Sequence, residues 1–158
     1  MTGLELCIII KTALTGMISP YQQKVACRNA GYIVQQSEKR DIDPLIVASV
    51  IYVESSFSPR VVSKAGACGL MQVLPKYSRY TCEQLKNPRT GIKDGIRALN
   101  WWLSWTKGDM DKSLCGYNAG TKCVTKPNSK FSRRVRRGYV RKVKTIHKLM
   151  VEASDKSN

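Results

Sequence analysis

Hydrophobic residues recur along this chain at intervals of three and four positions, the spacing that places side chains on one face of an α-helix. The alternation of polar and apolar positions that marks a half-buried strand is nearly absent. The pattern predicts helices over residues 21–39, 43–54, 88–107, 109–117 and 132–153. We therefore expect an all-α fold.

The predicted helix at residues 43–54 differs from the others because it is apolar almost all round. It begins with Asp43 as an N-cap and Pro44 at the first helical position, a combination typical of helix starts. Its apolar residues are Leu45, Ile46, Val47, Ala48, Val50, Ile51 and Val53. Apolarity on every side indicates a helix buried in the centre of the molecule. The last residue of this helix is Glu54.

Glu54 is the residue that points to a chemical function. Burial and the negative end of the helix dipole both disfavour its anion, so both raise its pKa. Arg60 and Lys64 would lower that pKa if they reached the carboxyl group. We expect desolvation to prevail, because basic side chains on a turn can point into solvent. A carboxylic acid that stays protonated near neutral pH is what cleavage of a glycosidic bond needs.

The net charge of +16 indicates an anionic partner. Charge alone does not choose among nucleic acid, a phospholipid surface and a cell-wall polymer. Residues 112–151 hold twelve Lys or Arg and no Asp or Glu, so this stretch is either a docking surface or a solvated helix face. The 158 residues suit one domain, and a hydrophobic content of 42% excludes a chain that is disordered throughout.

Six cysteines are present, and they contain no CxxC pair. With His147 as the one histidine, a structural zinc site is not indicated, and we expect no metal and no other cofactor. An even count permits three disulfides in any of fifteen connectivities. Cys115 and Cys123 bracket a turn and are the first pair to test. Buried free thiols are an equal alternative.

The predicted organisation is an apolar segment at residues 1–20, a main domain at 21–153 and a disordered tail at 154–158. The N-terminal segment lacks the basic start of a standard signal peptide and is too short to span a bilayer. We expect it to be a packing helix or an assembly contact. Residues 121–130 are the one linker-like stretch and are expected on the surface.

Glycosidases usually place two carboxylates about the scissile bond. After Glu54 the next acidic residue is Glu83, and the basic C-terminal region offers none. The other polar candidates are neutral hydrogen-bonding residues: Ser63, Gln72, Tyr117, Asn118 and Tyr139. Such groups suit a sugar with an N-acetyl arm, whose own atoms can act as the nucleophile.

Four ordered motifs carry a family resemblance. They are Glu-Ser-Ser-Phe at 54–57, Gly-Ala-Cys-Gly-Leu-Met-Gln at 66–72, Tyr-Asn-Ala-Gly at 117–120 and Gly-Tyr-Val at 138–140. Together they resemble the motifs of the soluble-type lytic transglycosylases, over roughly residues 21–150. The resemblance implies a lysozyme-like α-helical fold whose core is similar to that of goose-type lysozyme.

The resemblance also implies an activity on peptidoglycan. Glu54 would protonate the oxygen between N-acetylmuramic acid and N-acetylglucosamine, and its anion would then accept the proton of the muramoyl C6 hydroxyl. That hydroxyl attacks C1 and closes a 1,6-anhydro ring without water.

The remaining motif residues take roles by the same resemblance. Ser63 matches a serine near the acid and the N-acetyl group, Tyr117 a tyrosine beside the acid, and Tyr139 a tyrosine on the final helix. Gln72 and Asn118 match polar groups of the sugar site, and Met71 its apolar wall. Structural roles remain open: Ser63 can cap a turn, Met71 can fill a core gap, and Tyr139 can pack inward.

The chain departs from the family pattern at two positions. Many relatives have a glutamate near the tyrosine of the Gly-Tyr-Val motif, whereas Val135 stands here among arginines. Cys68 is unusual between Ala67 and Gly69. Neither departure affects the acid.

Two other functions remain open. One is a goose-lysozyme-like hydrolase that uses the same acid with water. The other is a non-catalytic basic virion, assembly or nucleic-acid-binding protein on the same scaffold.

The expected partners are peptidoglycan glycan strands, with anionic wall polymers on the basic C-terminal helix and virion or secretion-apparatus proteins on residues 1–20. We expect no specific nucleic acid. The expected place of action is the periplasm or cell wall, and a bacteriophage virion or lysis protein is the favoured origin.

Overall fold

A computed structural model describes residues 1–156 of the chain, and its regular elements are helical. In order they are α1 (Gly3–Ala13), α2 (Pro20–Glu38), α3 (Pro44–Ser55), a 3₁₀ turn (Pro75–Tyr77), α4 (Cys82–Leu85), α5 (Pro88–Trp105), α6 (Met110–Ala119), α7 (Thr121–Thr125), α8 (Lys130–Val135), a π-helical turn (Arg136–Val140) and α9 (Arg141–Asp155). The all-α expectation is confirmed.

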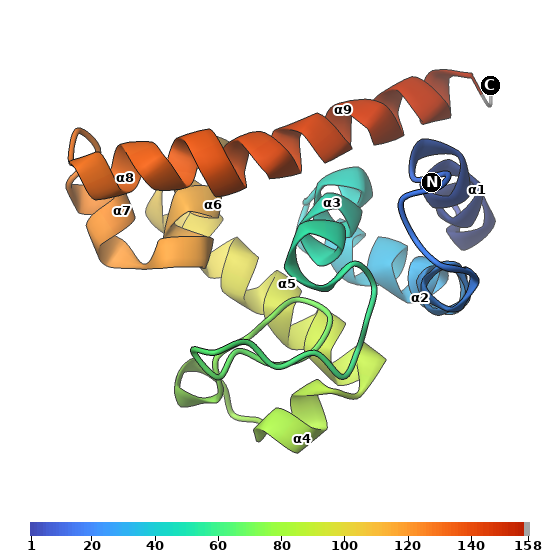
Figure 1. The fold of residues 1–158 in the computed structure, drawn as a ribbon, viewed down its shortest axis with the longest axis horizontal. Coiled ribbons are helices and arrows are strands. Elements are labelled where there is room, and N and C mark those ends of the chain that lie inside the picture. Colours follow the sequence, from blue (N-terminus) through green and yellow to red (C-terminus); the bar gives the residue numbers. More distant parts are fainter. Residues whose placement is uncertain (157–158) are drawn as a thin grey trace.

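Helix α3 lies in the centre of the molecule, beneath α9 and beside α2 (Figure 1). Its N-terminus is capped by the Asp43 side chain, which accepts a hydrogen bond from the Leu45 N–H at 2.9 Å. Val47, Val50 and Ile51 are fully buried. Since apolar side chains cover nearly the whole helix, it is stable only where neighbours surround it.

The predicted helix at 132–153 is a composite of three pieces. Helix α8, the π turn and α9 follow one another as a long rod along one edge of the molecule (Figure 1). Val143, Ile146 and Met150 form its buried stripe. The rod is tied to α3 by His147, whose Nε2 lies 2.7 Å from Asp43 Oδ2.

Helix α1 packs against α2 and α9, with Leu6, Ile10 and Leu14 fully buried. The two backbones of α1 and α2 lie close together at Gly3, where an added Cβ would lie 2.5 Å from the Gly31 Cα. Figure 1 shows the N-terminus and the end of α9 on this side of the molecule.

All six cysteines are paired, as Cys7–Cys27, Cys68–Cys82 and Cys115–Cys123. The pair expected first is therefore present, and the alternative of free thiols is wrong. The first bridge joins α1 to α2, and the second joins the loop after α3 to α4.

Two boundaries differ from expectation. The linker-like stretch 121–130 lies on the surface as expected, apart from Cys123, but it contains α7, and Cys123 is buried and bridged to α6. Helix α9 continues through Ser154 and Asp155, which we expected in a disordered tail. The remainder of that predicted tail includes residues 157–158, which lie outside the described residues.

Candidate active site

Glu54 occupies the last turn of α3 and is largely enclosed by the fold. Burial raises the pKa of Glu54 from its ordinary value of 4.5 to about 7, although the hydrogen bond from Tyr139 opposes the rise. Arg60 does not form an ion pair with this carboxyl group. The pKa of Glu83 is lowered first by the hydrogen bond and charge of Lys86, and the charge of Arg60 adds a smaller effect. Desolvation therefore prevails, as the sequence predicted.

Two tyrosines meet at this acid from distant parts of the chain. The Tyr139 hydroxyl donates to Glu54 Oε1 at 2.7 Å, across 85 residues of sequence. The Tyr117 hydroxyl donates to the carbonyl of Met71 at 2.7 Å. Burial, followed by the charge of Glu54, raises the pKa of both tyrosines, so both remain protonated donors near neutral pH.

The π turn explains how Tyr139 reaches the acid. It contains residues 136–140. Its backbone hydrogen bonds join residues five apart instead of four, so the side chains that follow are rotated about the helix axis relative to a regular α-helix. Tyr139 then faces α3, while Val143 and Ile146 still bury against the core. A π turn within a helix frequently occurs at a functional site.

The segment 61–73, which we call the glycine loop, is fastened to the end of α3. Ser55, next to the acid, donates through its hydroxyl to the carbonyl of Leu70 at 2.8 Å. Gly69 adopts a φ of 80°, and an added Cβ there would lie 2.2 Å from the carbonyl oxygen of Leu85. Only glycine fits both the conformation and the space.

The two predicted sugar-site residues of the glycine loop have structural contacts. Gln72 has a φ of 51°, and its side-chain amide donates to the carbonyls of Val61 and Gly69, each at 3.0 Å. Met71 is fully buried, against the position that a Cβ of Gly95 would take. The side chain of Met71 therefore has no surface that a sugar could contact in this structure, contrary to the expected apolar wall. The group of Met71 that reaches the site is its backbone carbonyl, which accepts the hydrogen bond from Tyr117.

Ser63 and Asn118 lie on different elements. The Ser63 hydroxyl accepts from the Ala67 N–H at 3.1 Å and so closes a turn of the glycine loop. Asn118 is exposed on α6, one residue after Tyr117. Direct contact of Ser63, Gln72 or Asn118 with sugar stays a prediction.

Sequence reasoning missed a buried charge near the site. Asp94 is 2% exposed, accepts from Arg97 Nε at 2.6 Å and from the Ser78 hydroxyl at 2.6 Å, and contributes to the electrostatic field on Tyr117. Asp94 and Arg97 are spaced three residues apart, which is typical of a helix ion pair but does not indicate burial. Both oxygens of this carboxylate accept hydrogen bonds from neighbouring side chains.

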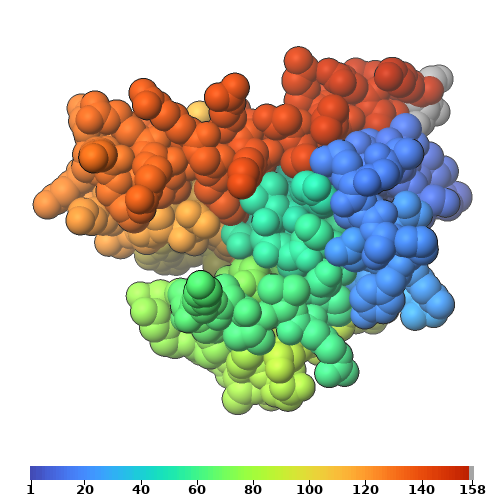
Figure 2. Space-filling view, viewed as in Figure 1, coloured from blue at the N-terminus to red at the C-terminus, as the bar shows by residue number. Residues whose placement is uncertain are grey.

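A cavity of about 500 Å³ opens between α9, the end of α3 and Met17. Its lining includes Tyr52, Val53 and Ser56 from the end of α3 and Gly138 from the π turn, but not Glu54 itself. Figure 2 shows a further hollow between the C-terminal helices, drawn in orange, and the loops drawn in green; beyond Ser56, no residue of these loops lines the cavity. Within residues 1–156, no three His, Cys, Asp or Glu side chains gather as metal ligands.

The family model of the transglycosylase SLT domain matches residues 31–139. The chain belongs to this family. The matched segment of the SLT domain includes α3, the glycine loop, α5 and α6, and it ends at Tyr139.

Curated relatives carry related names. The SLT domain is 35% identical over 86 residues to a transglycosylase of Enterobacteria phage PRD1, with 54% of this chain and 32% of the phage protein covered. It is 33% identical over 97 residues to an endo-type membrane-bound lytic murein transglycosylase A of Klebsiella pneumoniae subsp. pneumoniae, with 51% and 48% covered. The chain thus spans about a third to a half of the length of these relatives.

A solved structure has the same fold. The lytic transglycosylase Slt of Pseudomonas aeruginosa, solved as an inactive glutamate-to-glutamine mutant, matches with a TM-score of 0.67 over 91% of this chain and 30% of that one. The sequence identity is 20%, so the likeness concerns the fold. None of the described helices combines the length and apolarity needed to cross a membrane.

Proposed function

We propose that this SLT domain is a peptidoglycan lytic transglycosylase, which cleaves the β-1,4 bond between N-acetylmuramic acid and N-acetylglucosamine. The observation that carries the proposal is Glu54, a carboxylic acid with a pKa of about 7 at the end of a buried helix. At neutral pH such an acid is about half protonated, so it can both give and take a proton. Family membership and the names of the two curated relatives support the same reaction.

The reaction needs one carboxyl group in two successive roles. Glu54 donates its proton to the bridging oxygen, and the C1–O bond of the muramoyl sugar breaks. The resulting carboxylate accepts the proton of the C6 hydroxyl, whose oxygen bonds to C1 and closes the 1,6-anhydro ring. The acid is regenerated, and no water is consumed.

The surroundings of the acid suit this cycle. The hydroxyl of Tyr139 donates to Glu54 Oε1, and this contact strengthens when the carboxyl becomes an anion. Tyr117 is positioned nearby through the Met71 carbonyl. We place Ser63, Gln72 and Asn118 along the sugar, with Ser63 nearest the N-acetyl group.

The lone acid favours the transglycosylase over a goose-lysozyme-like hydrolase. An inverting hydrolase needs a second carboxylate to activate water. Asp94, the buried carboxylate near Tyr117, already accepts from Arg97 and Ser78. Intramolecular attack by the C6 hydroxyl requires no such group.

We infer that the protein acts in the periplasm or cell wall. Three disulfides suit an oxidising environment, and a net charge of +16 concentrates the enzyme on an anionic wall. A relative from a bacteriophage is in keeping with a bacteriophage origin, and we propose association with a virion. Residues 21–153 are proposed as the catalytic domain, with residues 1–20 as an added segment that can contact virion or secretion proteins.

Digestion of purified sacculi by the wild type and by Glu54→Gln tests the proposal. The wild type should release products that end in anhydromuramic acid, which are lighter by one water than hydrolase products. The variant keeps the shape of the side chain but cannot donate the proton, so its rate should fall by about 10²- to 10⁴-fold. Products with a reducing muramic acid end would instead identify a hydrolase, and undiminished lysis by Glu54→Gln would remove the acid from the mechanism.

A further inference from the structure

The helix that ends in Glu54 is tied to the C-terminal rod at both of its ends. At the catalytic end, the Tyr139 hydroxyl donates to Glu54 Oε1 at 2.7 Å. At the opposite end, His147 Nε2 lies 2.7 Å from Oδ2 of Asp43, the N-cap of α3. Tyr139 and His147 are eight residues apart, about two helical turns, so α3 and the rod run antiparallel between the two contacts.

The Asp43 carboxylate holds two partners with separate oxygens. Oδ1 accepts from the Leu45 N–H at 2.9 Å and begins α3, while Oδ2 faces the His147 ring. One short side chain therefore fixes both the start of α3 and the place of the rod beside it. Among the described residues, the other polar contact between α3 and the rod is a weaker one, from the Ser49 hydroxyl to the Met150 sulfur at 3.6 Å.

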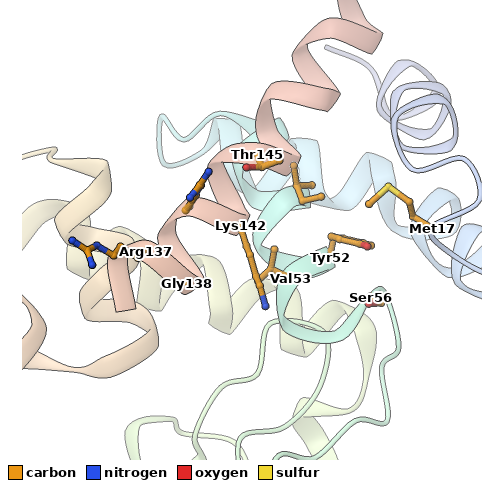
Figure 3. A pocket seen from close by; sticks show the side chains of 10 residues that line it. Met17, Tyr52, Val53, Ser56, Arg137, Gly138, Lys142 and Thr145 are labelled. Atoms are coloured by element: carbon orange, nitrogen blue, oxygen red, sulfur yellow. The ribbon is translucent and has the colours of Figure 1, made fainter. Parts of the chain in front are cut away.

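Apolar packing supports the rod incompletely at the C-terminal end of α3. The cavity of about 500 Å³ is lined there by Lys142 and Thr145 of the rod and by Val53 of α3 (Figure 3). Side chains that border a cavity lack contact atoms on one side, so they hold the rod less firmly than a close-packed interface would. A directional contact two turns away can therefore determine where the rod lies along α3, and with it where the Tyr139 hydroxyl lies.

We propose that His147 is a positioning residue for the reaction: its contact with Asp43 sets the place of the rod along α3 and so holds the Tyr139 hydroxyl on Glu54. The consequence for catalysis rests on the proposed function, whereas the consequence for the contact between Tyr139 and Glu54 is measurable in the free protein. His147 acts through Tyr139 and touches no reacting group. A general packing role, or an effect of its charge on Glu54, would give different results in the experiment below.

The test is a double-mutant cycle that combines His147→Leu with Tyr139→Phe. Leucine fills a similar space but has no atom that can form a hydrogen bond with Asp43. The first measured quantity is the titration midpoint of the Glu54 carboxyl carbon by NMR, in the protein without substrate. The second is kcat on purified glycan strands at neutral pH.

In the wild-type background, His147→Leu should raise the midpoint toward that of Tyr139→Phe, because it weakens the hydrogen bond that lowers the pKa of Glu54. In the Tyr139→Phe background, the same substitution should leave the midpoint in place, since the contact that it positions is already absent. The value of kcat should fall by about three- to tenfold in the first background and by less than about twofold in the second.

Two further variants control for the substitution itself. His147→Gln should keep the wild-type midpoint and rate, because the glutamine amide nitrogen extends about as far as histidine Nε2 and can donate to Asp43. Glu152→Leu also replaces a polar side chain of α9 by leucine, but it breaks an ion pair with Lys148 that lies within α9, at 3.8 Å. It should titrate and react as the wild type does.

An unchanged midpoint in His147→Leu, or one that falls because water reaches Glu54, would overturn the inference. So would an equal shift in both backgrounds, which would show that His147 acts by its charge and not through Tyr139. If His147→Leu does not fold, Asp43→Ser replaces it in the cycle, because serine still caps α3 but is too short to reach His147. If the wild type cleaves no glycan strand, the proposed function fails, while the NMR midpoints still decide whether His147 positions Tyr139.

Discussion

At the scale of single residues, burial and one hydrogen bond act in opposite directions on the pKa of Glu54. Enclosure by the fold raises the pKa to about 7, and the Tyr139 hydroxyl lowers it. The same hydroxyl stabilises the carboxylate that forms after proton transfer. Tyr139 therefore adjusts the pKa and supports the chemistry.

Removal of this hydroxyl by Tyr139→Phe should raise the pKa of Glu54 further. Activity depends on the protonated acid, so the alkaline limb of the kcat/KM profile should move to higher pH than in the wild type. At neutral pH kcat should fall by about 10- to 100-fold, because the anion loses a hydrogen bond from a neutral donor.

The matched control is Tyr21→Phe, a hydroxyl removed from an exposed position at the start of α2. Its pH profile should coincide with that of the wild type. An alkaline limb that stays in place in Tyr139→Phe would show that the hydrogen bond does not act on the acid.

Some of the site could be predicted from residues and some could not. The position and raised pKa of Glu54 followed from the apolar helix that precedes it, because local sequence determined its burial. Its bond to Tyr139 spans 85 residues and did not follow, since the inward stripe of the last helix predicts core packing equally well. For Met71 the resemblance indicated a sugar contact, whereas the close approach of Gly95 buries its side chain.

At the scale of elements, the glycine loop determines what surrounds the end of α3. The loop is closed by the Cys68–Val73 backbone pair and is joined to α3 through Ser55. It also places the Met71 carbonyl that orients Tyr117. A shift of the loop should therefore disturb catalysis as well as stability.

The substitution Gly69→Ala should displace the loop, because its Cβ would meet the Leu85 carbonyl and its φ of 80° strains an L-residue. We expect a loss in the free energy of unfolding of about 2–4 kcal/mol and a lower kcat/KM. Gly66→Ala is the control, since Gly66 has a φ of 83° but open space around it. That variant should lose only about 1–2 kcal/mol and retain activity. Equal urea-denaturation and kinetic results for the two variants would contradict this account.

The positions of the helices were easier to predict from the sequence than the π turn within the last one. Asp43-Pro44 and Asn87-Pro88 gave the starts of α3 and α5 correctly, because capping side chains and proline act within one turn. The π turn did not follow from the sequence, since an extra residue in one turn leaves the apolar spacing on both sides almost unchanged.

At the scale of the whole molecule, three disulfides link neighbouring elements, and the net charge bears on the kind of partner. The three bridges join α1 to α2, the glycine loop to α4, and α6 to α7. Sequence spacing favoured one pair of six cysteines, whereas the other two pairings depend on how distant segments pack. The charge of +16 predicted an anionic partner, but the structure was needed to show that Arg137, Arg141 and Lys142 line one cavity.

Removal of single bridges should separate stability from activity. Cys68→Ala/Cys82→Ala opens a link between positions 14 residues apart and should cost about 3 kcal/mol in the free energy of unfolding. Cys7→Ala/Cys27→Ala, with a separation of 20, should cost a similar amount. Only the first variant should also lower kcat/KM, because it frees the glycine loop beside the acid. Loss of activity in both variants to the same extent, measured where both remain folded, would argue against a specific role of that loop.

The most direct measurement is a titration of the Glu54 carboxyl carbon by NMR, with the Glu54→Gln spectrum used for assignment. The account predicts a midpoint near pH 7 for this one resonance, above those of Glu5 and Glu83, whose pKa values are lowered by hydrogen bonds to their carboxylates. A midpoint near 4.5 would show that Glu54 is an ordinary solvated anion at neutral pH, and the proposed acid would then hold no proton to donate.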